Sequence, residues 1–224
     1  MRALRLLSIV ALLAVASLAS AAGPELKTEE QKTLYAIGLA LSNSVASFGF
    51  TEAELEFVKA GLSDGVLNRE KKVELQPYGP KIQELNKARV AAVSAGEKKS
   101  GQAYLDKAAA EKGATKLPSG LVITTLKPGT GETPKPTDKV KVHYHGMLTD
   151  GSVFDSSVQR GQPATFTLNQ VIPCWTEGVL KMKVGGKSRL VCPAELAYAD
   201  RGVPPKIKPG ATLVFEVELL EILK

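Results

Sequence analysis

The chain has 224 residues, of which 44% are hydrophobic and 23% are charged. This composition is too apolar for a disordered chain, and the 20 glycines and 13 prolines have no fixed period, which excludes a collagen-like fibre. Two cysteines are too few for a disulfide-dense scaffold. The composition therefore indicates one large globular domain or two small ones.

The formal net charge of +6 arises from 29 basic and 23 acidic residues. The surplus basic residues are spread over short runs of mixed charge, without a basic helix face or a block of like charges. A mildly basic, solvated surface explains this distribution. We therefore expect no nucleic-acid partner.

Residues 1–21 have the pattern of a cleavable secretory signal peptide. Arg2 and Arg5 precede an apolar stretch from Leu6 to Leu18, and small residues ending in Ala19-Ser20-Ala21 follow it. The alternative, an anchoring transmembrane helix, needs about 20 apolar residues, and this stretch is shorter. Because no cysteine lies near the cleavage site expected after Ala21, no lipid anchor is predicted. We expect a periplasmic or secreted protein without a stable membrane anchor.

Export bears on Cys174 and Cys192, the only two cysteines, because an oxidising compartment allows a disulfide to persist. Within one chain they pair only with each other, and closing the loop between them would contribute roughly 3 kcal/mol on the chain-entropy account. Two buried thiols and a redox centre are the alternatives. The absence of a Cys-x-x-Cys spacing argues against redox catalysis, and the sequence leaves the bond itself open.

Proline placement divides the chain, since ten of the 13 prolines lie between Pro118 and Pro209. The proline-poor first half is expected to be helical. Residues 28–31 and 51–54 each match a capping box ahead of an apolar periodic run. Two short amphipathic helices are too small to bury both apolar stripes, so they need each other or a second copy of the chain. The stripes are Leu34, Ile37, Leu41, Val45 and Phe48 in the first run, and Leu55, Val58, Leu62 and Val66 in the second.

After the break at residues 77–80, residues 81–112 are rich in Ala, Lys, Glu and Gln and predict one long helix. Its middle, Ser94 to Gly101, is expected to be too polar to bury. Gly96 and Gly101 each weaken the helix by about 1 kcal/mol relative to Ala. We expect a largely exposed spacer helix, with a partly frayed linker as the alternative near the glycines.

From Leu121 onward the pattern changes to alternation in short runs. Residues 139–145 place Val140, Val142 and Tyr144 on one strand face and the polar residues between them on the other. Residues 149–152 predict a hairpin turn, residues 211–223 a closing strand, and residues 175–182 one short helix. This half is therefore predicted to be α+β, with a mostly antiparallel sheet.

Common catalytic patterns do not fit the sequence. His143 and His145, the only histidines, lie on the polar strand face and lack further ligands for zinc. No Gly-x-Ser-x-Gly elbow accompanies them, which argues against a Ser-His-Asp site. Neither a Gly-x-Gly-x-x-Gly loop nor a Walker-type loop occurs in the required setting. We expect no cofactor and no metal.

After residue 120 each predicted element carries one aromatic residue, and the segments around these residues form four ordered motifs. They are residues 142–148 (VHYHGML), 151–157 (GSVFDSS), 171–178 (VIPCWTEG) and 210–220 (GATLVFEVELL). The motifs resemble FKBP-type peptidyl-prolyl cis-trans isomerases over residues 118–224. The preceding half, especially residues 35–38 and 57–65, is similar to the amino-terminal dimerisation domain of the macrophage-infectivity-potentiator (Mip) class of bacterial FKBPs.

The resemblance implies an α+β fold in which an antiparallel half-barrel sheet wraps around one short helix. It divides the chain into a signal peptide (1–21), an all-α dimerisation domain (22–76), a long connecting helix (77–117) and the isomerase domain (118–224). An apolar pocket between sheet and helix would take a proline ring. A homodimer through the N-terminal helices is implied as well.

Carried over by position, the resemblance places Trp175 at the pocket floor, Asp155 at the rim and the Tyr198 hydroxyl against the substrate carbonyl. Ala199-Asp200 stands where Gly often follows the tyrosine, and Lys206 where an apolar residue is common. Trp175, Asp155 and Tyr198 would act in catalysis. The substrate-binding walls would be formed by Tyr144, Phe154, Phe166, Val171, Ile172 and Phe215, with Ile207 in a proline-rich loop overhanging the pocket.

Two functions follow from the resemblance. The first is an isomerase that assists the folding of exported proteins by binding Xaa-Pro segments of unfolded chains. The second is a dimeric chaperone-like module for unfolded clients in which isomerase activity is secondary. A catalytically silent fold is disfavoured, because almost every expected pocket residue is present. Macrocyclic immunosuppressant-type compounds are candidate inhibitors.

Overall fold

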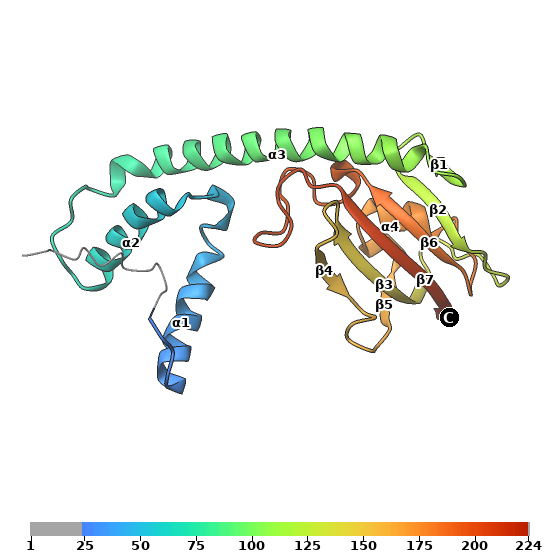
Figure 1. The fold of residues 1–224 in the computed structure, drawn as a ribbon, viewed down its shortest axis with the longest axis horizontal. Helices are drawn as coiled ribbons and strands as arrows, with labels where there is room; N and C mark the ends of the chain where they lie inside the picture. Colours follow the sequence, from blue (N-terminus) through green and yellow to red (C-terminus); the bar gives the residue numbers. More distant parts are fainter. Residues whose placement is uncertain (1–23, 224) are drawn as a thin grey trace, which may run out of the picture. The chain divides into compact units, whose positions relative to one another are not determined.

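The structure, a computed structural model, describes residues 24–223, so the predicted signal peptide lies outside the described residues. These residues divide into two compact units, residues 24–39 and residues 40–223. Figure 1 shows helices in the first part of the chain and a sheet with a short helix in the last part. The predicted succession of a helical region, a long helix and an antiparallel sheet is confirmed.

Both predicted capping boxes are present at the N-terminal helices. At α1 (Glu29–Ser42), the Thr28 hydroxyl accepts a hydrogen bond from the backbone N–H of Gln31, and the Gln31 side chain accepts one from the N–H of Thr28. At α2 (Glu52–Val66), Thr51 and Glu54 make the same reciprocal pair.

The first apolar stripe was predicted too long. Helix α1 ends at Ser42, so Val45 lies in a turn and Phe48 in the short 3₁₀ helix η1 (Ala46–Phe48). No residue of α1 or α2 is buried within the single chain. The apolar stripes therefore stay open to a further partner.

Helix α3 (Gly79–Ala109) follows the 3₁₀ helix η2 (Gln76–Tyr78) and is held to the preceding helices by polar contacts. Arg89 forms an ion pair with Glu54, and the hydrogen bond from Arg89 is the main reason that the pKa of Glu54 falls from 4.5 to about 2. The Ser47 hydroxyl donates to the Asn86 side-chain oxygen at 3.0 Å. These contacts attach η1 and α2 to the first half of α3.

The expectation that the middle of α3, residues 94–101, is too polar to bury is wrong at its two ends, while Ala95, Gly96, Lys99 and Ser100 between them are exposed. Ser94 is only 4% exposed, and Gly101 is buried as well. Ser94 is accommodated because its hydroxyl donates to Asp200 Oδ1 at 2.6 Å. At Gly101, a Cβ atom would lie 2.9 Å from Thr212 Cβ, so the missing side chain is what allows the helix to approach the sheet. Ser94 is buried because it pairs with Asp200, and Gly101 is buried because it lies close to Thr212. The hydrophobic periodicity of the sequence reveals neither contact.

The last part of the chain forms one antiparallel sheet of seven strands in the order β1-β2-β6-β7-β3-β4, with β5 paired to β3. The predicted hairpin at residues 149–152 joins β3 to β4, where the Asp150 carboxylate accepts from the Ser152 N–H at 2.8 Å. The strands are β1 (Ala114–Lys116), β2 (Val122–Lys127), β3 (Lys139–Leu148), β4 (Val153–Ser156), β5 (Ala164–Thr167), β6 (Lys187–Cys192) and β7 (Leu213–Leu223).

The sheet packs against other elements on both of its faces. Alternation along β3 and β7 directs Val140, Val142, Tyr144, Leu213 and Phe215 toward the main core, which includes the short helix α4. On the opposite face, Val122, Val191 and Val214 pack against Leu105 and Ala108 of α3. The C-terminal turns of α3 are thus part of the isomerase body.

Helix α4 spans Pro173–Val179, whereas residues 175–182 were predicted. It therefore starts two residues earlier and ends three residues earlier than expected. Pro173 at its first position suits a helix start, because the missing N–H has no intrahelical partner there. Cys174 and Cys192 are joined in a disulfide with a Cα–Cα distance of 5.7 Å. The bond ties α4 to β6 and settles the alternatives that the sequence left open.

Two alanine substitutions on α3 separate helix propensity from close packing. Gly96→Ala is expected to raise the free energy of unfolding by up to about 1 kcal/mol, because Ala is the better helix former and no heavy atom lies within 4 Å of the new Cβ. Gly101→Ala is expected to lower it by about 1–2 kcal/mol, because overlap with the buried Thr212 outweighs the same gain. Urea unfolding of both variants measures the difference, and equal stabilisation would contradict the docking of α3.

Candidate functional site

Trp175 forms the centre of an aromatic cluster inside the sheet. It is 4% exposed, and its indole Nε1–H has no hydrogen-bond partner among residues 24–223. Its ring meets those of Tyr144, Phe166 and Phe215 edge to face, with centroid distances of 5.3, 5.4 and 5.4 Å. This geometry suits the ring quadrupoles and builds an apolar floor that β3, β5 and β7 surround.

Above this floor lies a cavity of about 330 Å³, which we call the aromatic pocket. Nine of the ten site residues predicted from the sequence line it, and the tenth, Ile207, lines a neighbouring cavity together with Phe154, Asp155 and Tyr198. Its volume is within the range of small-ligand sites. The lining residues are Tyr144, Phe154, Asp155, Phe166, Gln170, Val171, Ile172, Trp175, Tyr198 and Phe215.

Asp155 and Tyr144 are held at the rim by Arg160. The Tyr144 hydroxyl donates to one Asp155 carboxylate oxygen, and the Arg160 guanidinium donates to the other and, at 3.0 Å, to the Tyr144 oxygen. Burial alone would raise the pKa of Asp155, but the hydrogen bonds from Tyr144 and Arg160 and the charge of Arg160 lower it below 3.8. Burial, and next the bond to Asp155, raises the pKa of Tyr144. Both groups therefore keep their protonation state at neutral pH.

The Tyr198 hydroxyl differs from that of Tyr144, because it has no hydrogen-bond partner within the described part of the chain. It remains available to a ligand. The next residue, Ala199, has a φ of +48°, a left-handed conformation that costs a residue with a Cβ about 1–2 kcal/mol. Two backbone bonds of 2.8 Å hold it there, from its own N–H to the Ala194 carbonyl and from the Gly210 N–H to its carbonyl.

Residues 203–210, the proline loop, follow Tyr198 and are fastened on two sides. On the pocket side, Lys206 Nζ donates to the Phe154 carbonyl at 3.1 Å, which gives this polar departure from the family pattern a local partner. On the other side, Lys208 forms a 3.0 Å ion pair with Glu97 of α3. Asp200, just before the loop, lies 2.7 Å from the Lys98 ammonium of α3. This hydrogen bond is the main cause of the raised pKa of Lys98. Helix α3 thus fixes the segment that carries Tyr198.

Three residues at the site were not identified from the sequence. Gln170 lines the pocket, and Arg160 orients Asp155. A Cβ atom at Gly146 would lie 2.8 Å from Phe154 Cζ and 3.1 Å from Phe215 Cε1, so only glycine leaves room for these rings. Gly146 lies within the motif of residues 142–148, which marks it as part of the site. The sequence does not show which rings it faces.

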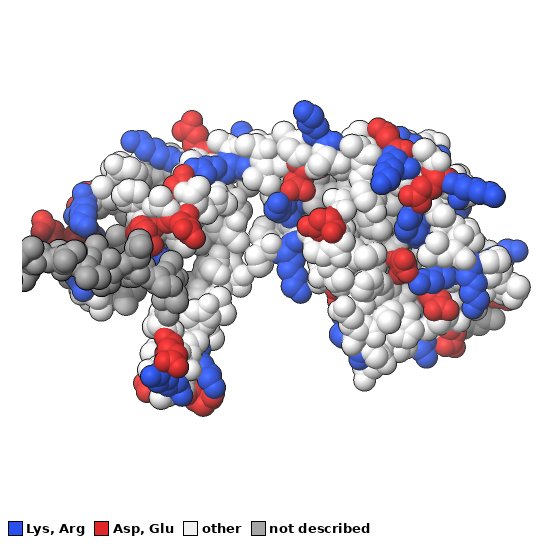
Figure 2. Space-filling model, in the orientation of Figure 1, with Lys and Arg blue, Asp and Glu red and all other residues white. Residues whose placement is uncertain are grey.

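The two histidines lie outside the aromatic pocket. His143 Nδ1 is 3.1 Å from the Ser157 hydroxyl, and His145 Nδ1 is 2.9 Å from the Ser156 hydroxyl. Among residues 24–223, no group of three or more His, Cys, Asp or Glu side chains is arranged to hold a metal, and no helix has the length and apolarity to cross a bilayer. On the face shown in Figure 2, basic and acidic side chains are mixed.

Comparison with known proteins gives the family. Residues 130–220 match the model of FKBP-type peptidyl-prolyl cis-trans isomerases, and residues 30–123 match the domain amino terminal to that isomerase. The FKBP-type isomerase FkpA of Aeromonas hydrophila is 44% identical over 218 residues, which cover 92% of this chain and 81% of the relative. The outer membrane protein MIP of Legionella longbeachae is 33% identical over 224 residues, covering 97% of this chain and 96% of the relative.

The crystal structure of FkpA from Escherichia coli superposes with a TM-score of 0.65 at 37% identity, covering 88% of this chain and 98% of that chain. The chain therefore belongs to the FKBP-type peptidyl-prolyl cis-trans isomerases, in the Mip-like class. It is an enzyme that interconverts the cis and trans forms of Xaa-Pro bonds. The resemblance read from the four motifs is confirmed.

Removal of the Arg160 guanidinium tests the electrostatics of the rim. Arg160→Ala is expected to raise the pKa of Asp155, because a hydrogen bond and a positive charge that lower it are lost. Since the folded-state pKa of Asp155 is depressed, its ionised form contributes stability above the ordinary value of 3.8 and loses that contribution as the pH falls through the folded value.

The difference in unfolding free energy between wild type and Arg160→Ala should therefore be full at neutral pH and shrink below about pH 4. Carboxyl NMR titration measures the pKa directly. Arg160→Lys is the control, because it keeps the positive charge while losing the forked donor. An Asp155 titration that is identical in wild type and Arg160→Ala would refute this account.

Proposed function

We propose that the aromatic pocket is where this isomerase binds and rotates Xaa-Pro bonds of unfolded exported proteins, with Trp175, Tyr198 and Asp155 as the groups that act on the substrate. The observation that carries this is a cavity lined by six aromatic residues, one of which, Tyr198, has a hydroxyl without a hydrogen-bond partner among residues 24–223. Tyr144, Phe154, Phe166, Val171, Ile172 and Phe215 would surround the prolyl ring, with Ile207 at the adjoining loop.

Such a pocket suits the chemistry of amide rotation. Resonance in the planar amide sets a barrier of about 18–20 kcal/mol, and rotation makes and breaks no covalent bond. In the twisted transition state the amide loses resonance and its carbonyl becomes less polar, so apolar walls favour that state over the planar one. Each ~1.4 kcal/mol of selective stabilisation corresponds to a tenfold faster reaction.

The polar groups at the rim would complete the site. The Tyr198 hydroxyl is free to donate to a carbonyl of the substrate and hold it while the prolyl ring is buried. Asp155 accepts hydrogen bonds from Tyr144 and Arg160, so its carboxylate would hold these two groups in place at the rim beside the bound prolyl ring. Neither role requires a proton to move.

Export to the periplasm is proposed from the signal-peptide pattern of residues 1–21. The disulfide between Cys174 and Cys192 supports it, because such bonds persist in oxidising compartments. The clients would then be proteins folding after export, in which slow Xaa-Pro isomerisation limits the folding rate.

Homodimerisation through the N-terminal helices is proposed from their exposed apolar side chains. Within one chain, Leu34 and Ile37 on α1 and Leu62 and Val66 on α2 are all more than half exposed, and Phe57 is 80% exposed. Patches of this kind mark interaction surfaces. The match of residues 30–123 to the domain amino terminal to FKBP-type isomerases supports a shared role for these helices.

A second candidate function, a chaperone-like module that holds unfolded clients, is favoured by the same exposed apolar surface. Unfolded chains expose apolar segments, so any part of this surface that the dimer leaves exposed would bind them without any catalysis. The two activities separate at the aromatic pocket, because only isomerisation needs the Tyr198 hydroxyl.

Conservative changes in the pocket test the isomerase site. Tyr198→Phe is expected to lower kcat/KM for a short Xaa-Pro peptide about tenfold, the equivalent of one hydrogen bond in the transition state. Trp175→Leu should lower it further, because the floor is lost. Tyr35→Phe, at an exposed tyrosine of α1, is the matched control. Full activity of folded Tyr198→Phe would remove Tyr198 from the mechanism, while retained suppression of client aggregation would assign that activity to the helices.

Sedimentation equilibrium tests the dimer. Phe57→Glu is expected to weaken self-association at least tenfold, because a charge would be buried in an apolar interface. Val158→Glu makes a similar change at an exposed apolar residue of the isomerase part and should leave the association unchanged. A monomeric wild-type protein at micromolar concentration would refute the dimer.

A further inference from the structure

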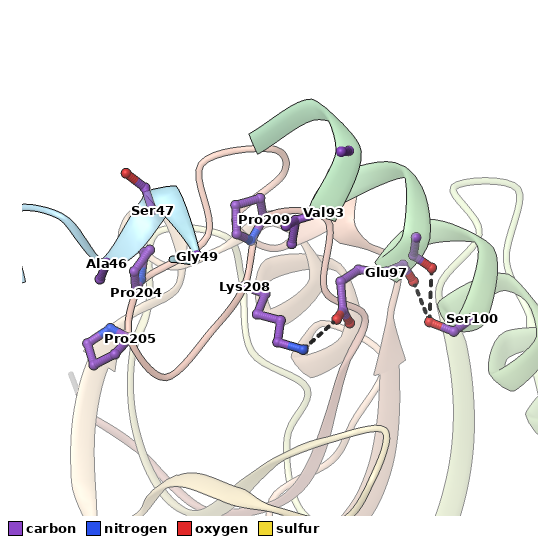
Figure 3. Close-up of a pocket in the computed structure, with 12 residues that line it drawn as sticks. Ala46, Ser47, Gly49, Val93, Glu97, Ser100, Pro204, Pro205, Lys208 and Pro209 are labelled. Atoms are coloured by element: carbon purple, nitrogen blue, oxygen red, sulfur yellow. Dashed lines mark hydrogen bonds and ion pairs between the residues drawn. The ribbon is translucent and has the colours of Figure 1, made fainter. Parts of the chain in front are cut away.

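A cavity of about 420 Å³ lies between α3 and the proline loop, away from the aromatic pocket. Figure 3 shows Lys208 and Pro209 of the loop beside Val93 and Glu97 of α3, and Pro204 and Pro205 beside the η1 segment. We call it the helix–loop cavity. Its size is within the range of ligand sites, and the roles proposed above make no use of it.

Small residues keep the helix side of this cavity open. Ala92 and Gly96 lie one helical turn apart on α3 and both line it. No heavy atom lies within 4 Å of the position that a Cβ of Gly96 would occupy, and the same holds for Gly49 beyond η1. A ligand can therefore come close to the helix backbone, as an extended chain of modest width would.

The polar side chains that line the cavity already have partners. Lys208 is paired with Glu97, and the Ser100 hydroxyl lies 3.2 and 3.0 Å from the backbone carbonyls of Gly96 and Glu97 (Figure 3). The Ser47 hydroxyl donates to Asn86. What remains for a ligand is the surface of alanine, glycine, valine and three prolines. This surface suits an uncharged, apolar ligand.

A third cavity at the proline loop adjoins both the aromatic pocket and the helix–loop cavity. That cavity shares Phe154, Asp155 and Tyr198 with the aromatic pocket, and it shares Pro204 and Pro205 with the helix–loop cavity. The contacts from Ser94 and Lys98 to Asp200 hold the base of the loop against α3. The three cavities therefore follow one another around the proline loop, with Pro204 and Pro205 lining two of them.

We propose that an unfolded client, held by its prolyl residue in the aromatic pocket, continues across Pro204-Pro205 and places an uncharged apolar stretch in the helix–loop cavity. This rests on the proposed function, since the aromatic pocket must hold the proline. The cavity is then an extended subsite for chains longer than a short peptide. Helix α3 acts as part of the substrate site as well as a connection between the two ends of the protein.

Two Ala→Leu substitutions on α3 test the subsite. Ala92→Leu fills the cavity, whereas Ala95→Leu adds the same side chain at an exposed position of the same helix that does not line it. The substrates are a tetrapeptide with a central Xaa-Pro bond and the same peptide extended at both ends by six alanine and valine residues. For the extended peptide, Ala92→Leu should raise KM about tenfold with kcat unchanged, while Ala95→Leu has no effect. Neither variant should change tetrapeptide kinetics.

Each outcome distinguishes the subsite from the catalytic pocket. If the wild-type protein does not catalyse isomerisation of the tetrapeptide, the proposed role of the aromatic pocket is refuted. Normal tetrapeptide catalysis with equal KM for both peptides, or equal behaviour of the two variants, would overturn the subsite alone. Gly96→Leu, which has open space at its Cβ, repeats the test if Ala92→Leu fails to fold. A shift in sedimentation without a change in KM would assign the cavity to contact between copies and also overturn the proposal.

Discussion

The isomerase part depends on one packing arrangement, the seating of Trp175 within the sheet. Its ring touches three other aromatic rings edge to face, so the floor of the pocket and the hydrophobic core are the same set of side chains. The disulfide from Cys174, the residue before it, anchors the helix that carries the indole. Gly146 leaves space for Phe154 and Phe215 beside it. These contacts form the pocket in the absence of substrate, and a preformed site is what selective stabilisation of a twisted amide requires.

The second constraint is the close approach of α3 to the isomerase part. Gly101 allows the backbone of the helix to come near Thr212, and Leu105 and Ala108 cover the outer face of the sheet. Nearer the N-terminus of the helix, Ser94 and Lys98 hold Asp200, two residues after Tyr198. The helix is therefore coupled to the loop that borders the pocket. The polar middle of α3 makes this connection through Ser94 and Lys98. These contacts explain how a charged, alanine-rich sequence forms one continuous helix, Gly79–Ala109.

Much of this was accessible from the sequence, for reasons that are local. Capping boxes at Thr28 and Thr51 depend on residues three apart, and strand alternation in residues 139–145 depends on a period of two. The pocket residues were found because they lie in ordered motifs that resemble a known family. Arg160 and Gln170 were missed because nothing around them in the chain indicates that they face Asp155 or the pocket. The burial of Ser94 was missed because its partner is 106 residues away.

By itself, the sequence determined the helical and sheet halves, the family and the set of aromatic residues, because each is encoded in short-range periodicity or in contiguous motifs. Only the tertiary structure decided that the two cysteines are bonded, that Tyr144 and Arg160 donate to Asp155 at the rim, and that Ser94 of α3 is buried. Those features depend on distances between residues far apart in the chain. Such distances are set when the sheet closes around α4 and α3 docks on its outer face, and no local pattern carries them.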